Sequence, residues 1–240
     1  RRFYRVNRKI LIKNNTKTMN KALLFKEWIK TRWMFLLMFV VFILAMGYIA
    51  LRISSAARNV GMPHLWEVFI LKNVVLLDQI KVLPLLAGII MGITQFIPEM
   101  TKKRFKLTLH LPLGENRIVF LMLSYGMACL LLLFTVSYGG FLWGLSADFP
   151  REVVGAWFAT ILPQVLCGFA SYLLTAWIIL EPVWSQRIYN AVIGLLILSL
   201  FMVQGVPGSY IYMLPFLFGT LILLALYPKI SIRHFKEGMQ

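Results

Sequence analysis

"WMFLLMFVVFILAMGYIALRI", residues 33–53, contains a single charged side chain, Arg52, close to its end. A helix needs about 20 predominantly apolar residues to cross the hydrocarbon core of a membrane. The stretch therefore predicts a transmembrane helix, and it sets the class of structure in which the rest of the chain has to be understood.

Segments of the same character recur along the chain, at 80–97, 118–142, 156–180, 188–204 and 210–227. None of them shows the strand-like alternation of apolar and polar residues, and a backbone in lipid has to satisfy its hydrogen bonds within its own segment. The whole chain is 60% hydrophobic and 14% charged, which lies outside the range of soluble domains. We predict an all-α, polytopic membrane protein with six transmembrane helices, of which the last two are the shortest.

Basic residues are distributed unequally between the two sides of these predicted spans. The chain has a net charge of +16, and twenty of its 25 Lys and Arg lie on one side, in the N-terminal segment, the 98–117 loop, the 181–188 loop and the C-terminal tail. By the positive-inside rule, we predict that both termini lie in the cytoplasm. We expect a multi-pass protein of the cell membrane, that is, the inner or plasma membrane. Because no aromatic-basic binding module accompanies the charge, membrane lipid is the expected partner of these residues and nucleic acid is not.

The segment before the first span has two chemically different halves. On a helical wheel one half carries Leu24, Phe25, Trp28, Ile29 and Trp33, and the other carries Lys26, Glu27, Lys30 and Thr31. We predict that residues 19–32 form an interfacial amphipathic helix with Trp28 and Trp33 at headgroup depth. A simple extension of the first span is the alternative.

The domain organisation follows from these segments. Residues 1–18 are assigned as a basic N-terminal extension with little folded structure, because Met19 looks like a natural start. The interfacial helix at 19–32 follows, then a six-span domain at 33–227, and finally a cytoplasmic tail at 228–240.

Two pairs of glycines are candidates for close helix packing. Gly88 and Gly92 lie on one face of the second predicted span, and Gly140 and Gly144 on one face at the end of the third. Two glycines four residues apart let another helix backbone approach closely. The alternative is chance spacing in glycine-containing spans.

The predicted spans contain almost no ionisable groups, which limits the possible chemistry. Buried charges are typical of ion-coupled transporters, so a secondary transporter is disfavoured. No Ser–His pair, paired carboxylates or His–Glu metal motif lies at membrane depth, and the outer carboxylates have no site-like spacing: Glu67, Asp78, Asp148 and Glu152. We therefore expect no catalytic, cofactor-binding or metal-binding residues, and a membrane enzyme is the least favoured class.

Three short motifs carry a resemblance to a known family. Glu99 in "FIPEM" closes the second span, the basic-apolar "TKKRFKLTL" follows, and Pro112 in "LPLGENR" precedes the third span. Together with the helix "LLFKEWIKTRW" at 23–33, this order resembles the permease subunits of ABC transporters of the type-two exporter class. The chain departs from that family between its last two spans, where only "GVPGSY" stands in place of short re-entrant helices.

The resemblance implies a membrane-spanning subunit that forms half of a transport path and is not itself an enzyme. The 98–117 loop would be the coupling element that contacts a separate ATPase subunit, through Glu99, Lys102, Lys103, Arg104, Phe105, Leu107 and Leu109. The chain has no GxxxxGK[ST] phosphate loop, so ATP and Mg²⁺ are expected on two copies of that ATPase. A second permease chain, identical or similar, would complete the path.

The alternative reading belongs to another class, a non-transporting six-span scaffold or accessory subunit of a membrane complex. In that case the 98–117 segment is only a solvated basic loop.

Overall fold

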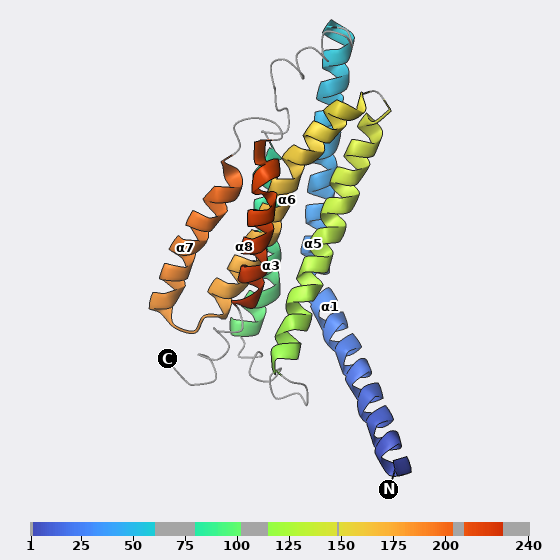
Figure 1. Ribbon diagram of the computed structural model, residues 1–240, viewed down its shortest axis with the longest axis vertical. Coiled ribbons are helices and arrows are strands. Elements are labelled where there is room, and N and C mark those ends of the chain that lie inside the picture. The colour runs from blue at the N-terminus through green and yellow to red at the C-terminus, as the bar shows by residue number, and fades with distance from the viewer. Residues whose placement is uncertain (1, 61–79, 102–114, 148, 204–208, 228–240) are drawn as a thin grey trace.

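The fold consists of helices in the computed structural model, which describes residues 2–60, 80–101, 115–147, 149–203 and 209–227 (Figure 1). The helices are α1 (Arg2–Val60), α3 (Leu83–Thr101), α5 (Glu115–Leu145), α6 (Arg151–Leu180), α7 (Trp184–Met202), the short 3-10 helix η2 (Ser209–Met213) and α8 (Leu214–Leu226). No strand occurs within the described ranges. The predicted all-α class is confirmed.

Five of the helical segments are long and apolar enough to cross a membrane. They are Thr18–Ala56, Leu83–Thr101, Arg117–Leu145, Arg151–Leu180 and Trp184–Met202. These segments confirm the prediction of a polytopic helical membrane protein. The sixth predicted span, 210–227, coincides with a shorter apolar helix, Ile211–Leu226.

Successive helices run in opposite directions, so their ends gather at two ends of a bundle (Figure 1). At the end called here the basal end, α3 and α6 terminate and α5 and α7 begin, while α1 extends beyond the bundle toward its N-terminus. The ring of Tyr227, directly after α8, lies 4.2 Å from the ring of Trp177 in the last turns of α6. The end of α8 therefore also lies at the basal end, and the opposite end is called the distal end.

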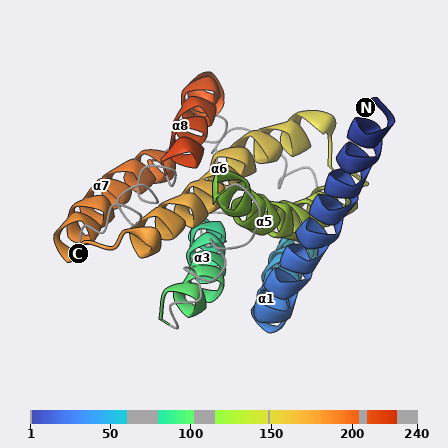
Figure 2. The same cartoon turned by 90° about the horizontal axis from the view of Figure 1, so that it is seen from below.

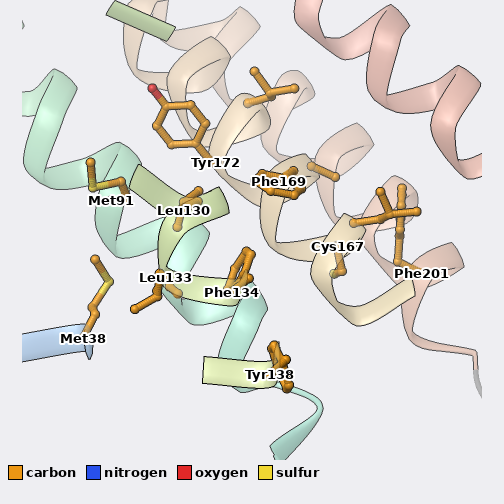
Figure 3. Close-up of a cluster of buried hydrophobic side chains, with 14 of the residues drawn as sticks. Met38, Met91, Leu130, Leu133, Phe134, Tyr138, Cys167, Phe169, Tyr172 and Phe201 are labelled. Carbon is orange, nitrogen blue, oxygen red and sulfur yellow. The ribbon is translucent and has the colours of Figure 1, made fainter. Parts of the chain in front are cut away.

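α6 is the central helix of the bundle. Figure 2 shows it between α3 and α5 on one side and α7 and α8 on the other, and it packs against all four. Every side chain from Leu166 to Leu174 is buried. Figure 3 shows the core that results, where the ring of Phe134 from α5 meets that of Phe169 from α6 edge to face at 5.5 Å. Such close packing drives helix association in lipid, where water does not force apolar surfaces together.

The two glycine pairs have different surroundings. A Cβ at Gly88 would collide with the Gly168 carbonyl oxygen of α6, and one at Gly92 would lie 2.8 Å from Thr175 Cβ. A Cβ at Gly140 or Gly144 would meet nothing within 4 Å. These two glycines line an apolar groove of about 590 Å³ between α1 and α5. Only the first pair brings two helix backbones together within the described residues.

α1 is one continuous helix that includes residues 2–18, where we expected little folded structure. It also includes 19–32, so the segment expected to lie at the membrane surface continues directly into the first span. The part of α1 from Lys26 to Thr31 holds the polar residues described next.

Candidate functional site: an ionic cluster at the basal end

A buried cluster of charged side chains connects α1 to the last turn of α3. Glu99 Oε1 lies 2.9 Å from Lys26 Nζ and 2.9 Å from Lys30 Nζ. Lys30 Nζ also lies 2.9 Å from Glu27 Oε1, one turn earlier on α1. These four residues are called the ionic cluster. Two carboxylates and two ammonium groups give it no net charge.

Burial makes this pairing energetically important. Glu27 and Glu99 are 0% and 1% exposed, and the side chain of Lys30 is 15% exposed. Removing a charge from water costs several kcal/mol per ion, so a buried carboxylate requires a close partner. Lys26, with its side chain 37% exposed, connects the cluster to the surface.

Hydrogen bonds extend the cluster to two further helices. The carbonyl oxygen of Gln95 on α3 accepts a bond from Lys30 Nζ at 3.0 Å. The Gln95 side chain donates from Nε2 to the Met122 carbonyl of α5 at 2.8 Å and accepts from the Tyr172 hydroxyl of α6 at 2.8 Å. A single buried glutamine therefore connects the lysine of α1 to α5 and α6.

A second polar contact joins α1 to α5. The hydroxyls of Thr31 and Tyr125 lie 2.6 Å apart, and Thr31 also donates to the Glu27 carbonyl one turn earlier at 3.0 Å. Thr31 is completely buried. Four helices, α1, α3, α5 and α6, are thus joined by polar contacts at the same end of the bundle.

The last two turns of α3 present two oxygens to Lys30. The Gln95 carbonyl oxygen accepts a hydrogen bond from Lys30 Nζ at 3.0 Å, and Glu99 Oε1 accepts one at 2.9 Å. Residues four apart lie on one face of a helix, so a single ammonium contacts the backbone of one turn and the side chain of the next.

The 19–32 segment has the reverse orientation of an amphipathic helix in a soluble protein, whose apolar half would face the core. Its apolar half faces away from the protein, with exposed fractions of 64% for Phe25, 40% for Trp28 and 71% for Trp33. Leu24 and Ile29 are exposed as well. The polar half, which would face water in an interfacial helix, packs against α3 and α5.

The predicted site residues fall into two groups. Glu99 lies in the ionic cluster, at the end of α3. The other proposed coupling residues lie outside the described residues: Lys102, Lys103, Arg104, Phe105, Leu107 and Leu109. Of the seven proposed coupling residues, the structure therefore places one, Glu99.

Sequence reasoning missed the buried role of Glu27, Lys30, Gln95 and Tyr172. We expected almost no ionisable groups inside the spans, but the apolar helices extend past the predicted limits and include Glu27 and Glu99. One available signal was the spacing of Glu27 and Lys30, three residues apart on the face opposite the apolar half. Another was the presence of Glu99 next to a span in a chain with only nine acidic residues.

The arrangement can hold helices in a fixed relation, and its chemistry is that of ion pairs and hydrogen bonds. Within the described part of the chain, no three His, Cys, Asp or Glu side chains gather as a metal site requires. Both cysteines, Cys129 and Cys167, are free thiols. Comparison of the chain with protein-family models, with curated proteins and with solved structures gave no match.

Proposed function

We propose that this chain is the membrane-spanning subunit of an ATP-driven ABC transporter of the exporter class. It forms half of the translocation path and couples to a separate ATPase subunit through the 98–117 loop. One observation carries the proposal: Glu99, at the start of that loop, forms ion pairs with Lys26 and Lys30 of α1. A force on the loop would reach α1 directly.

Transmission through the ionic cluster has a physical basis. An ion pair with buried carboxylates cannot separate without leaving a charge in a poorly solvating environment, so α1 and the end of α3 move together. Gln95 and Tyr172 pass the same displacement to α5 and α6 through hydrogen bonds of 2.8 Å. A tilt of α3 at its basal end would therefore move four helices, as required for a switch between inward-facing and outward-facing states.

The proposed topology has six spans with both termini in the cytoplasm. The sixth is η2 with α8, which returns to the basal end. Trp28 and Trp33, both exposed, suit the headgroup layer, so residues 19–32 serve as the helix that connects the cytoplasm to the first span. Two such chains, identical or similar, would work with two ATPase subunits that bind ATP and Mg²⁺.

The test is a pull-down of the tagged full chain from its native membrane in mild detergent, with ATP hydrolysis measured in the eluate. We expect wild-type protein to bring an ATPase with it and Phe105→Asp to lose it, because a carboxylate replaces an apolar contact. Glu99→Gln should retain the ATPase but change its rate of ATP hydrolysis. Glu152→Gln, in the first turn of α6 at the distal end, is the matched control and should behave as wild type.

Either of two results would overturn the proposal. If no ATPase co-purifies with the wild-type chain, a non-transporting scaffold becomes the better account. The same holds if Phe105→Asp retains the ATPase and Glu99→Gln leaves its hydrolysis rate unchanged.

A further inference from the structure

A second groove lies at the basal end, apart from the ionic cluster. It has a volume of about 460 Å³ and lies between the ends of α3 and α6 and the beginning of α7. Its walls are mainly apolar, formed by Ile97, Met100, Ile178, Ile179, Ile188 and Ala191. Its volume falls within the range of about 300–1,000 Å³ that is usual for sites that bind small molecules.

The surroundings of the groove indicate a hydrocarbon chain as its occupant. All three helices belong to the segments that are apolar enough to cross a membrane. Beyond the groove, α7 has an exposed apolar surface, with Val192, Leu195 and Leu196 between 53% and 69% exposed. An alkyl chain in the groove would lie next to this apolar surface.

The lining also includes Arg187 and Trp184, in the first turn of α7, and this part of the groove is called here its mouth. Arg187 Nε donates to the Glu181 carbonyl at 2.7 Å, and its Cζ lies 5.3 Å from the centroid of the Trp184 ring. These contacts hold the guanidinium at the groove. The hydrogen bond uses one of five N–H donors, and its acceptor is a neutral carbonyl, so the positive charge is not neutralised by it.

Arginine and tryptophan in this position are suited to a phospholipid headgroup. The planar guanidinium matches the oxygens of a phosphate, and tryptophan is enriched at the boundary between membrane and water. Trp184 is 74% exposed at the first position of α7. The chain also has a net charge of +16, which favours a ligand with net negative charge.

We propose that this groove binds one anionic phospholipid from the leaflet at the basal end. The phosphate contacts Arg187 beside Trp184, and part of an acyl chain fills the space between Ile97, Ile179 and Ile188. The site is independent of the proposed transport function, since it requires no ATPase and contains no residue of the ionic cluster.

The test is native mass spectrometry of the purified full chain in detergent, titrated with dioleoyl phosphatidylglycerol or dioleoyl phosphatidylcholine. We expect tighter binding of phosphatidylglycerol by wild-type protein, and a loss of about fivefold in that affinity for Arg187→Gln, because one interfacial cation is removed. Arg52→Gln is a matched control: Arg52 also stacks on an aromatic ring, that of Tyr48 at 5.8 Å, but lies toward the distal end. It should bind both lipids as wild type does.

A second variant protects the test against misfolding, because Arg187 also bonds the α6–α7 connection. Ala191→Phe leaves Arg187 in place and fills the groove, so it should lower the affinity of the chain for both lipids. Three results would overturn the proposal: equal affinity of wild type for the two lipids, unchanged phosphatidylglycerol binding in Arg187→Gln, or unchanged binding in Ala191→Phe. If Arg187→Gln retains the lipid but loses a co-purifying protein, the mouth of the groove is a protein contact instead.

Discussion

Three oxygens lie around the ammonium group of Lys30. Its Nζ lies 2.9 Å from Glu27 Oε1, 2.9 Å from Glu99 Oε1 and 3.0 Å from the Gln95 carbonyl oxygen. Glu99 and Gln95 accept hydrogen bonds from this ammonium, whereas Glu27 contributes an ion pair and accepts no hydrogen bond. Loss of Glu99 would leave one donor without its acceptor, and loss of Glu27 would remove the ion pair.

Replacing Glu99 tests the energetic role of the ionic cluster. Glu99→Gln removes the charge that faces both lysines, and we expect the free energy of unfolding to fall by about 2 kcal/mol. The loss is below the roughly 3–5 kcal/mol of a completely buried pair, because the side chain of Lys26 is 37% exposed and partly solvated. The midpoint of thermal unfolding of the purified chain in detergent measures the effect.

Glu152→Gln is the control for that measurement, because Glu152 is exposed at the start of α6. It should leave the midpoint unchanged. Equal midpoints for Glu99→Gln and wild type would show that the cluster contributes nothing to stability.

At the scale of the helices, the contact between α3 and α6 depends on the missing side chain of Gly88. A Cβ there would meet the Gly168 carbonyl, Ser171 Oγ and the Tyr172 backbone nitrogen. Two of these three atoms belong to the backbone of α6 and cannot rotate away. Separation of the two helices is the only relief, and it would also disturb the bond between Tyr172 and Gln95.

Alanine substitutions at the two glycine pairs should therefore have opposite effects. We expect Gly88→Ala to destabilise the chain by about 1–3 kcal/mol through overpacking. Gly140→Ala should be neutral or stabilising by up to about 1 kcal/mol, because alanine favours the helix and its Cβ meets open space. Thermal unfolding of both variants in detergent compares them directly.

A destabilising effect of Gly140→Ala would contradict this expectation. It would mean that another surface, such as a second copy of the chain, covers the groove between α1 and α5 in the purified protein.

Hydropathy was sufficient to predict the apolar helices from residue 33 onward, but it did not predict the helix over residues 2–18 and could not orient the segment at 19–32. In water the apolar half of a helix faces the protein, and in lipid it faces outward, so the same pattern fits both orientations. The orientation depends on the residue that pairs with the polar half of the helix, and that residue, Glu99, is 69 residues from Lys30 in the chain. The pairing of Gln95 with Met122 and Tyr172 is likewise tertiary, since no local spacing predicts which helices become neighbours.

At the scale of the whole molecule, the direction of α8 makes a topology with six spans testable. We propose a variant with Cys129→Ala and Cys167→Ala as background, into which one new cysteine is introduced at a time. Arg58→Cys, near the distal end of α1, should react with a membrane-impermeant maleimide in intact cells. Ser185→Cys, at the start of α7, and Ser231→Cys, in the C-terminal tail, should react only after permeabilisation.

The side on which Ser231→Cys reacts distinguishes the possible counts of spans. If α8 does not cross the membrane, Ser231→Cys and Arg58→Cys will react on the same side. If all three positions react in intact cells, or if Ser185→Cys reacts there and Arg58→Cys does not, the assigned orientation is wrong.

Because α1 is continuous, the angle about its axis between its polar residues at the ionic cluster and its buried apolar residues is fixed. Lys30 and Thr31 point to α3 and α5, and three later residues of the same helix bury their side chains in the core of the bundle, namely Phe35, Met38 and Phe42. Each residue turns a helix by about 100°, so one residue added between Thr31 and Phe35 would rotate the lysines toward lipid while the core stayed in place. Seven added residues would restore the direction to within about 20° but displace the lysines by about 10 Å along the axis. The three residues between Thr31 and Phe35 are therefore a spacer whose length, more than its composition, determines whether the charges reach Glu99.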